Sequence, residues 1–186
     1  MVFTHDTRES LGMAVDLVNT LPGMTVAGDD RLLSASDLAG FLALHPYSGL
    51  VRGDDAERSD VRAIRARLRE LWELGRDGAV PAVNAMLADG RARPRLVRHD
   101  PYDWHIHATD DDAPLATRML VDAAMAVVDV IRADEYRRMR VCSAPDCRAV
   151  YVDFSRNRSK LYCDTGNCGN RVNVTAYRLR KARGSG

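Results

Sequence analysis

Four cysteines near the C-terminal end are the residues of this chain best suited to do chemistry. They form two pairs with the same spacing, Cys142 with Cys147 and Cys163 with Cys168, and the chain has no other cysteine. Two thiolate pairs joined by a short connector can close on one tetrahedral ion, and structural Zn²⁺ prefers four such ligands at about 2.3 Å. The spacing therefore predicts one structural zinc ion whose four positions are all filled by the protein.

Two other interpretations of the cysteines are a pair of disulfides and a set of unrelated buried thiols. The first ten residues lack the basic segment and apolar run of a signal peptide. No stretch approaches the roughly 18 apolar residues of a membrane helix. We therefore expect a cytoplasmic protein, and disulfides are rare in that compartment. Paired spacing in a reducing compartment favours a metal site.

The formal net charge of +1 conceals an uneven distribution along the chain. Residues 1–140 carry 18 arginines and 23 acidic residues, whereas residues 141–186 carry nine basic and three acidic residues. The first part is therefore acidic, at −5, and the second part is basic, at +6. A basic terminal segment favours contact with nucleic acid, and it also occurs where it only raises solubility.

The first 140 residues are predicted to be mainly helical, with one β-hairpin. The hairpin is expected where residues 95–99 and 103–108 alternate between polar and apolar side chains. Pro81 suits the first turn of a helix, and the nearly continuous apolar run from Leu120 to Ile131 predicts the central helix of the domain. Apolar spacing predicts helices over residues 9–21, 37–44 (capped by Ser34 or Ser36), 56–75, 81–88 and 114–140.

Polar residues on the first predicted helix form a candidate ligand pocket. Asp16, Asn19 and Thr20 interrupt an otherwise apolar pattern. They could line a pocket for a small-molecule effector, or their side chains could bond the backbone of a neighbouring loop. The second role is favoured, because buried polar groups usually satisfy backbone groups.

Other polar clusters in the first 140 residues have simpler interpretations. Arg62, Arg65 and Arg69 share one face of a helix with glutamates between them, which predicts a solvated face. His105 and His107 could hold a metal, but we expect them on an exposed face, opposite a buried Trp104 and Ile106. The acidic run 110–112 is expected to cap the helix that follows. No arrangement suggests a nucleophile or a phosphate-binding loop, so we expect no enzymatic activity.

The C-terminal segment predicts a small metal-dependent module. Residues 150–154 form a strand-like run between the cysteine pairs, and a helix is predicted from Gly169 to about Arg183. A cysteine knuckle, a strand and a helix begun by the last cysteine are typical of a treble-clef-like finger. A core this small cannot be held by apolar burial alone, so the metal would supply most of its folding free energy.

The C-terminal segment resembles the CGNR zinc finger. The resemblance rests on Cys142, Cys147, Asp153, Ser155, Asn157, Cys163 and the signature Cys168-Gly169-Asn170-Arg171. The whole chain resembles bacterial proteins that join this finger to an N-terminal ABATE domain, described as a stress-induced transcription regulator. The run from Asp16 to Thr20 is similar to a segment of that domain's first helix. Departures are Tyr151 and Tyr162, where the finger usually has Phe and Trp, and Asn173, where a lysine is common.

Together these patterns predict a mainly α protein in two parts. Residues 1–140 would form a multihelical ABATE-like sensor or regulatory domain with a small β-hairpin, and residues 141–186 a CGNR-type, treble-clef-like four-cysteine zinc finger. The resemblance implies a stress-related transcription regulator that binds DNA through basic residues of the finger. The alternative is a zinc-stabilised module that binds a protein or a small molecule and no DNA. The candidate DNA contacts are Arg156, Arg158, Lys160, Arg171, Arg178, Arg180, Lys181 and Arg183.

Overall fold

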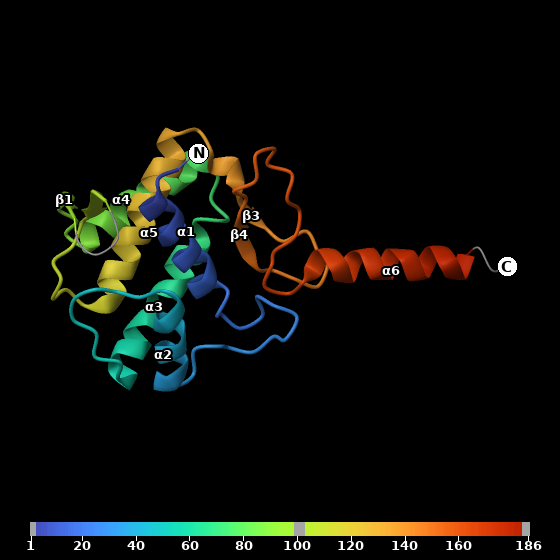
Figure 1. Ribbon diagram of the computed structural model, residues 1–186, viewed down its shortest axis with the longest axis horizontal. Coiled ribbons are helices and arrows are strands. Elements are labelled where there is room, and N and C mark those ends of the chain that lie inside the picture. Colours follow the sequence, from blue (N-terminus) through green and yellow to red (C-terminus); the bar gives the residue numbers. More distant parts are fainter. Residues whose placement is uncertain (1–2, 99–102, 184–186) are drawn as a thin grey trace.

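The computed structural model describes residues 3–98 and 103–183, and this part of the chain is mainly α-helical, as predicted. Figure 1 shows most helices gathered in one body, from which the last helix extends away. The elements are α1 (His5–Val18), α2 (Ala35–Leu44), α3 (Asp55–Glu70), α4 (Arg76–Asp89), β1 (Arg95–Val97), β2 (His105–His107), α5 (Leu115–Arg132), the 3₁₀ helix η1 (Tyr136–Arg138), β3 (Met139–Val141), β4 (Val150–Val152) and α6 (Cys168–Arg183).

The core of the body forms around α5. This helix packs against α1, α3 and α4, and it buries side chains on most of its circumference, including Leu115, Met119 and Val127. Each such side chain contributes about 1.5–3 kcal/mol when it leaves water. The prediction that the apolar run from Leu120 to Ile131 forms the central helix is therefore confirmed.

Several helix boundaries differ from the sequence prediction, among them the end of α3, which comes at Glu70 and not at residue 75. α4 begins at Arg76, so Pro81 lies inside the helix and not in its first turn. α5 ends at Arg132, earlier than the pattern suggested, because Asp134 adopts a left-handed backbone conformation with φ of 57° that a helix cannot continue. The chain beyond it turns through η1 into β3.

The β-hairpin forms where it was predicted, but the face that lies toward the body is not the predicted one. Leu96 pairs with Ile106 in an antiparallel register. Trp104 is 61% exposed and Ile106 is 44% exposed, so their predicted burial is wrong. His105 and His107 lie on the half-buried face. Alternation along a strand defines two faces but does not say which one the body will cover.

The acidic run before α5 does not cap the helix, because Pro114 occupies the N-cap position. Asp110 instead receives a hydrogen bond from Arg93 over 2.6 Å, and Asp111 lies 3.6 Å from the Arg95 guanidinium. These ion pairs tie the segment before α5 to the start of the hairpin.

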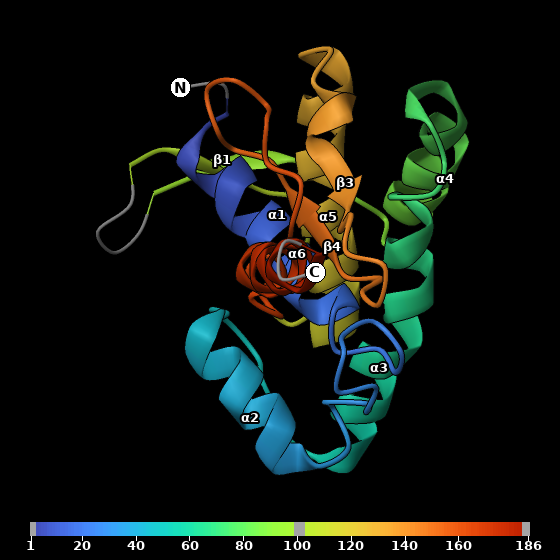
Figure 2. The ribbon, with the colours of Figure 1, turned by 90° about the vertical axis from the view of Figure 1, so that its right-hand side faces the viewer.

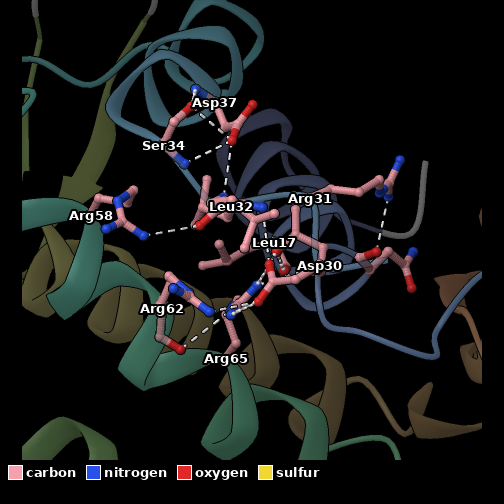
Figure 3. Close-up of polar contacts among 12 residues, drawn as sticks. Leu17, Asp30, Arg31, Leu32, Ser34, Asp37, Arg58, Arg62 and Arg65 are labelled. Carbon is pink, nitrogen blue, oxygen red and sulfur yellow. Dashed lines mark hydrogen bonds and ion pairs between the residues drawn. The ribbon is translucent and has the colours of Figure 1, made fainter. Parts of the chain in front are cut away.

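A buried ion pair joins α3 to the loop that follows α1 (Figure 3). Arg65 is only 3% exposed, and its Nη1 and Nη2 donate to the two carboxylate oxygens of Asp30 over 2.8 and 2.9 Å. Arg62 adds a third bond to Asp30 over 2.8 Å. Hydrogen bonding from Arg65 holds the pKa of Asp30 well below its usual value. The predicted solvated face is therefore wrong at Arg65, which is a core residue.

The second sheet belongs partly to the core of the body. β3 and β4 pair antiparallel, β4 lies against α1, and Met139, Val150 and Val152 are buried with the core side chains of the helices. The domain boundary predicted at residue 140 falls inside β3. Among the described residues, no helix combines the length and apolar content needed to span a bilayer.

Candidate metal centre

The four cysteine thiols converge on one point, as the spacing predicted. All four Sγ atoms lie within 4.8 Å of one another and all four side chains are buried. The Sγ atoms of Cys147 and Cys163 are 3.7 Å apart, and so are those of Cys163 and Cys168. Thiolates bound to zinc at about 2.3 Å stand about 3.8 Å apart at the corners of a tetrahedron. The cysteines therefore form a tetrahedral metal-binding group that fits a single structural zinc ion.

A bound cation would change the ionisation of the cysteine thiols in the cluster. Burial raises the pKa of the Cys147 thiol, and it raises that of Cys163 to about 11. At Cys168 burial acts in the same direction, but the Arg171 guanidinium and the neighbouring thiols lower the pKa overall. A divalent ion would favour the thiolate form of every ligand and compensate the charge that burial penalises.

Local backbone geometry directs the cysteine thiols toward one another from two turns. We call these turns the first knuckle, residues 142–147, and the second knuckle, residues 163–168. Beyond β3, the Cys142 N–H donates to the Ala149 carbonyl over 2.8 Å, which folds the first knuckle back on itself. In the second knuckle a Cβ on Gly166 would stand 3.0 Å from the Cys168 Sγ, so glycine leaves room for the thiolate. Tyr151 packs with the four cysteines in a small core of their own.

Arg171, the last residue of the signature, holds the two knuckles together. Its Nη1 and Nη2 donate to the carboxylate of Asp146 in the first knuckle over 2.5 and 3.0 Å. Its Nε donates to the Gly166 carbonyl over 3.2 Å, and Nη2 lies 3.3 Å from the Cys168 Sγ. The side chain is thus engaged within the finger. The sequence pattern did not predict Asp146 as its partner, because the two residues lie 25 positions apart in the chain.

Asp153 fixes the loop between the knuckles. It is fully buried, and its two carboxylate oxygens accept hydrogen bonds from the backbone N–H groups of Ser155 and Lys160, each over 2.8 Å. Arg138, also buried, donates to the carbonyls of Asp153 and Ser155. Burial opposes ionisation of Asp153, but these hydrogen bonds and the Arg138 charge keep the pKa of its carboxyl low. These hydrogen bonds therefore hold the loop between the knuckles in one conformation.

The predicted DNA-contacting residues lie in two places, on the loop between the knuckles and on α6. Arg156 is exposed on the loop, whereas Arg158 pairs with Glu135 over 3.2 Å and Lys160 with Asp164 over 2.5 Å. On α6 the side chains of Arg178, Arg180 and Lys181 are exposed and lie beyond the metal cluster. The side chain of Arg183 lies outside the described part of the structure.

Asn19 joins the finger to the body. Its Nδ2 donates to the Val150 carbonyl over 2.9 Å, and its Oδ1 accepts from the Val150 N–H over 2.8 Å. Nearby, the Trp72 indole donates to the Tyr151 carbonyl over 3.1 Å, and the Arg148 N–H to the Met24 carbonyl over 3.0 Å. Asn19 thus satisfies backbone groups, the role that sequence analysis favoured for it.

Asp16 and Thr20, the other two residues of the candidate pocket, line an open groove of about 440 Å³. Asp16 pairs with His45 over 2.9 Å, and the Thr20 hydroxyl donates to the Leu17 carbonyl. Asp164 and Thr165 of the finger also line the groove. The body and the finger therefore both contribute to it.

We expect Asn19→Leu to lower the free energy of unfolding by about 3 kcal/mol relative to the parent protein. Val150 is fully buried, so the substitution leaves its N–H and C=O without partners in an apolar setting. Denaturant unfolding of the zinc-loaded chain measures the change. Asn84→Leu, on the exposed side of α4, is the matched control and should change stability by less than about 0.5 kcal/mol. Equal effects of the two substitutions would contradict the anchoring role of Asn19.

Comparison with protein families agrees with the geometry of both parts. The family described as "Putative stress-induced transcription regulator", ABATE, matches residues 11–134. The CGNR zinc finger matches residues 138–181, which include all four converging cysteines. None of the curated proteins matches the chain. The ABATE match spans the helical body and covers most of the chain. The chain therefore belongs to the ABATE family and ends in a CGNR zinc finger.

Proposed function

We propose that this protein is a cytoplasmic, non-enzymatic transcription regulator and that its zinc finger binds DNA. The observation that carries the proposal is the character of α6. The helix contains no acidic residue, and its outer half presents Arg178, Arg180 and Lys181 to solvent. Basic side chains exposed along one element bind phosphates and release condensed counterions.

The position of α6 supports the same function. The helix starts at the metal cluster and extends away from the body (Figure 1), and Figure 2 views it along its axis. Its length of 16 residues corresponds to about 24 Å. The helical body carries a net negative charge, so a polyanion is repelled from it. The finger, which carries a net positive charge, therefore offers DNA a more attractive approach than the body does.

Arg156 provides a second basic contact from the loop between the knuckles. It is exposed, and the loop is held at Asp153 and at Lys160. A cation on a fixed loop loses little conformational entropy when it meets a phosphate. Arg171 has a different role in the proposal, because its guanidinium is bonded to Asp146 and stabilises the finger.

Salt dependence tests the proposal. We expect the zinc-loaded chain to bind duplex DNA with a log–log slope against salt concentration of about −4 to −5, as four to six phosphate contacts require. Arg178→Ala should weaken binding to all sequences and reduce the slope by about one. Fluorescence anisotropy titrations at several salt concentrations provide the measurement. Arg132→Ala, an exposed arginine at the end of α5, is the control and should leave the slope unchanged.

The alternative function is a zinc-stabilised module that binds a protein or a small molecule without DNA. The groove between the body and the finger favours a small effector, since a ligand lying between His45 and Thr165 would contact both parts. Such a ligand would also serve as an effector of a DNA-binding finger. Failure of the zinc-loaded protein to bind any duplex at low salt would favour the alternative over the DNA-binding function.

A further inference from the structure

The exposed side chains of α6 are not distributed evenly around the helix. With 3.6 residues per turn, five positions fall within an arc of about 100°. They are Asn170, Asn173, Val174, Tyr177 and Lys181, and all five are exposed. We call this set the amide face. It combines two amides, a valine, an aromatic ring and one cation, and it extends over about 16 Å of helix.

Two arginines border the amide face. Arg178 lies about 80° to one side of Asn170 around the helix axis and Arg180 about 80° to the other. Both side chains are exposed. With a long cationic side chain at each edge, a helix can contact both walls of a groove. The narrower polar face between these two side chains then faces the floor of the groove.

The opposite side of α6 faces the finger. Val172, near the start of the helix, packs against the cluster formed by the cysteines and Tyr151, and the neighbouring Arg171 donates to Asp146 of the first knuckle over 2.5 Å. The knuckles therefore fix the rotation of the helix about its own axis. The amide face is directed away from the finger, where a long ligand can reach it.

We propose that the amide face of α6 enters the major groove of duplex DNA, where Asn173 reads a base edge while Arg178 and Arg180 bind phosphates on the two walls. The proposal rests on the DNA-binding function proposed above. The major groove is about 12 Å wide and admits one α-helix, and the absence of acidic residues on α6 matches the charge of both walls. An asparagine amide forms two hydrogen bonds with adenine, through its N6 and N7.

This placement assigns different effects to residues that are close in the chain. Loss of Asn173 should change which sequences are preferred, because an amide carries no charge for phosphate binding. Loss of Arg180 should weaken binding to all sequences alike, since phosphate contacts position the protein and carry no sequence information. A surface that only attracts DNA by charge would show no such division.

Selection from a duplex library with a randomised centre tests the proposal on the full-length, zinc-loaded chain. The parent protein should enrich sites with adenine at one position. Asn173→Ala should reduce the preference for that adenine about tenfold, with the salt slope unchanged. Asn173→Lys should lose the same preference and increase the slope by about one. Arg180→Ala should keep the preference and reduce the slope by about one.

Thr175→Ala, on the side of α6 away from the amide face, is the matched control and should alter neither quantity. Circular dichroism of each variant establishes that the helix is retained. If the parent protein binds DNA but Asn173→Ala keeps its sequence preference, or weakens all sequences equally, the amide face does not read bases. Binding by the parent protein without any sequence preference also overturns the proposal. Absence of DNA binding by the parent protein instead refutes the proposed function.

Discussion

The Cys168→Ser variant is expected to lose its zinc, to unfold the finger and to lower the stability of the helical body. A structural zinc ion contributes about 10–16 kcal/mol of apparent binding free energy to modules of this kind. The cluster around the four cysteines contains few other apolar side chains that could replace that contribution. The effect should extend into the body because β4 is bonded to Asn19 and Trp72.

Elemental analysis should show the zinc content fall from about one ion per chain to near zero. Most of the helical circular dichroism should remain, while the midpoint of thermal unfolding should decrease. Trp72 reports the loss of the finger directly, because its indole bonds to Tyr151. Its fluorescence should shift to longer wavelength in a Trp104→Phe background, which removes the exposed tryptophan.

Ser143→Ala is the control for this experiment, because the exposed Ser143 side chain lies in the same knuckle and only its backbone N–H is bonded, to the Leu161 carbonyl. This variant should keep its zinc. A metal-free chain with a folded finger would refute the structural role of the ion. An unchanged unfolding midpoint of the body in Cys168→Ser would show that the body and the finger fold independently.

Asp30→Asn should destabilise the body by about 3 kcal/mol or more. The substitution leaves the Arg65 guanidinium buried without a counter-charge, and breaking one side of a buried ion pair typically costs about 3–5 kcal/mol. The new amide group can accept only part of the hydrogen bonding that Arg62 and Arg65 now supply (Figure 3). Urea unfolding of the zinc-loaded protein at neutral pH provides the measurement.

The pH dependence gives an independent test of this ion pair. Hydrogen bonding from Arg65 depresses the pKa of Asp30 in the folded state, so the stabilisation is present above the unfolded pKa of about 3.9 and is lost as the pH falls below it. The difference between the parent protein and Asp30→Asn should therefore shrink on acidification. Asp29→Asn, at an exposed neighbouring position, should have little effect at any pH. Equal destabilisation by both substitutions would contradict the role of Asp30.

The sequence by itself determined the metal centre and most of the helices. The ligands lie in two local knuckles, so residue type and spacing sufficed to predict that four thiols meet. Helices such as α1, α3 and α5 were predicted because apolar periodicity is also a local property. The boundaries were less well predicted, because Pro81 was accommodated inside α4 and Asp134 ended α5 early.

Only the tertiary structure decided which distant groups meet. Asn19 lies 131 residues before its partner Val150, and Arg65 lies 35 residues after Asp30. Periodicity gives the apolar side of an element, but it does not give the partner that a buried polar side chain will find, because that depends on how the elements pack. For the same reason the hairpin turned its histidines, and not Trp104, toward the body. The direction of α6 away from the body, on which the proposed DNA binding depends, likewise follows from how β3, β4 and the knuckles dock.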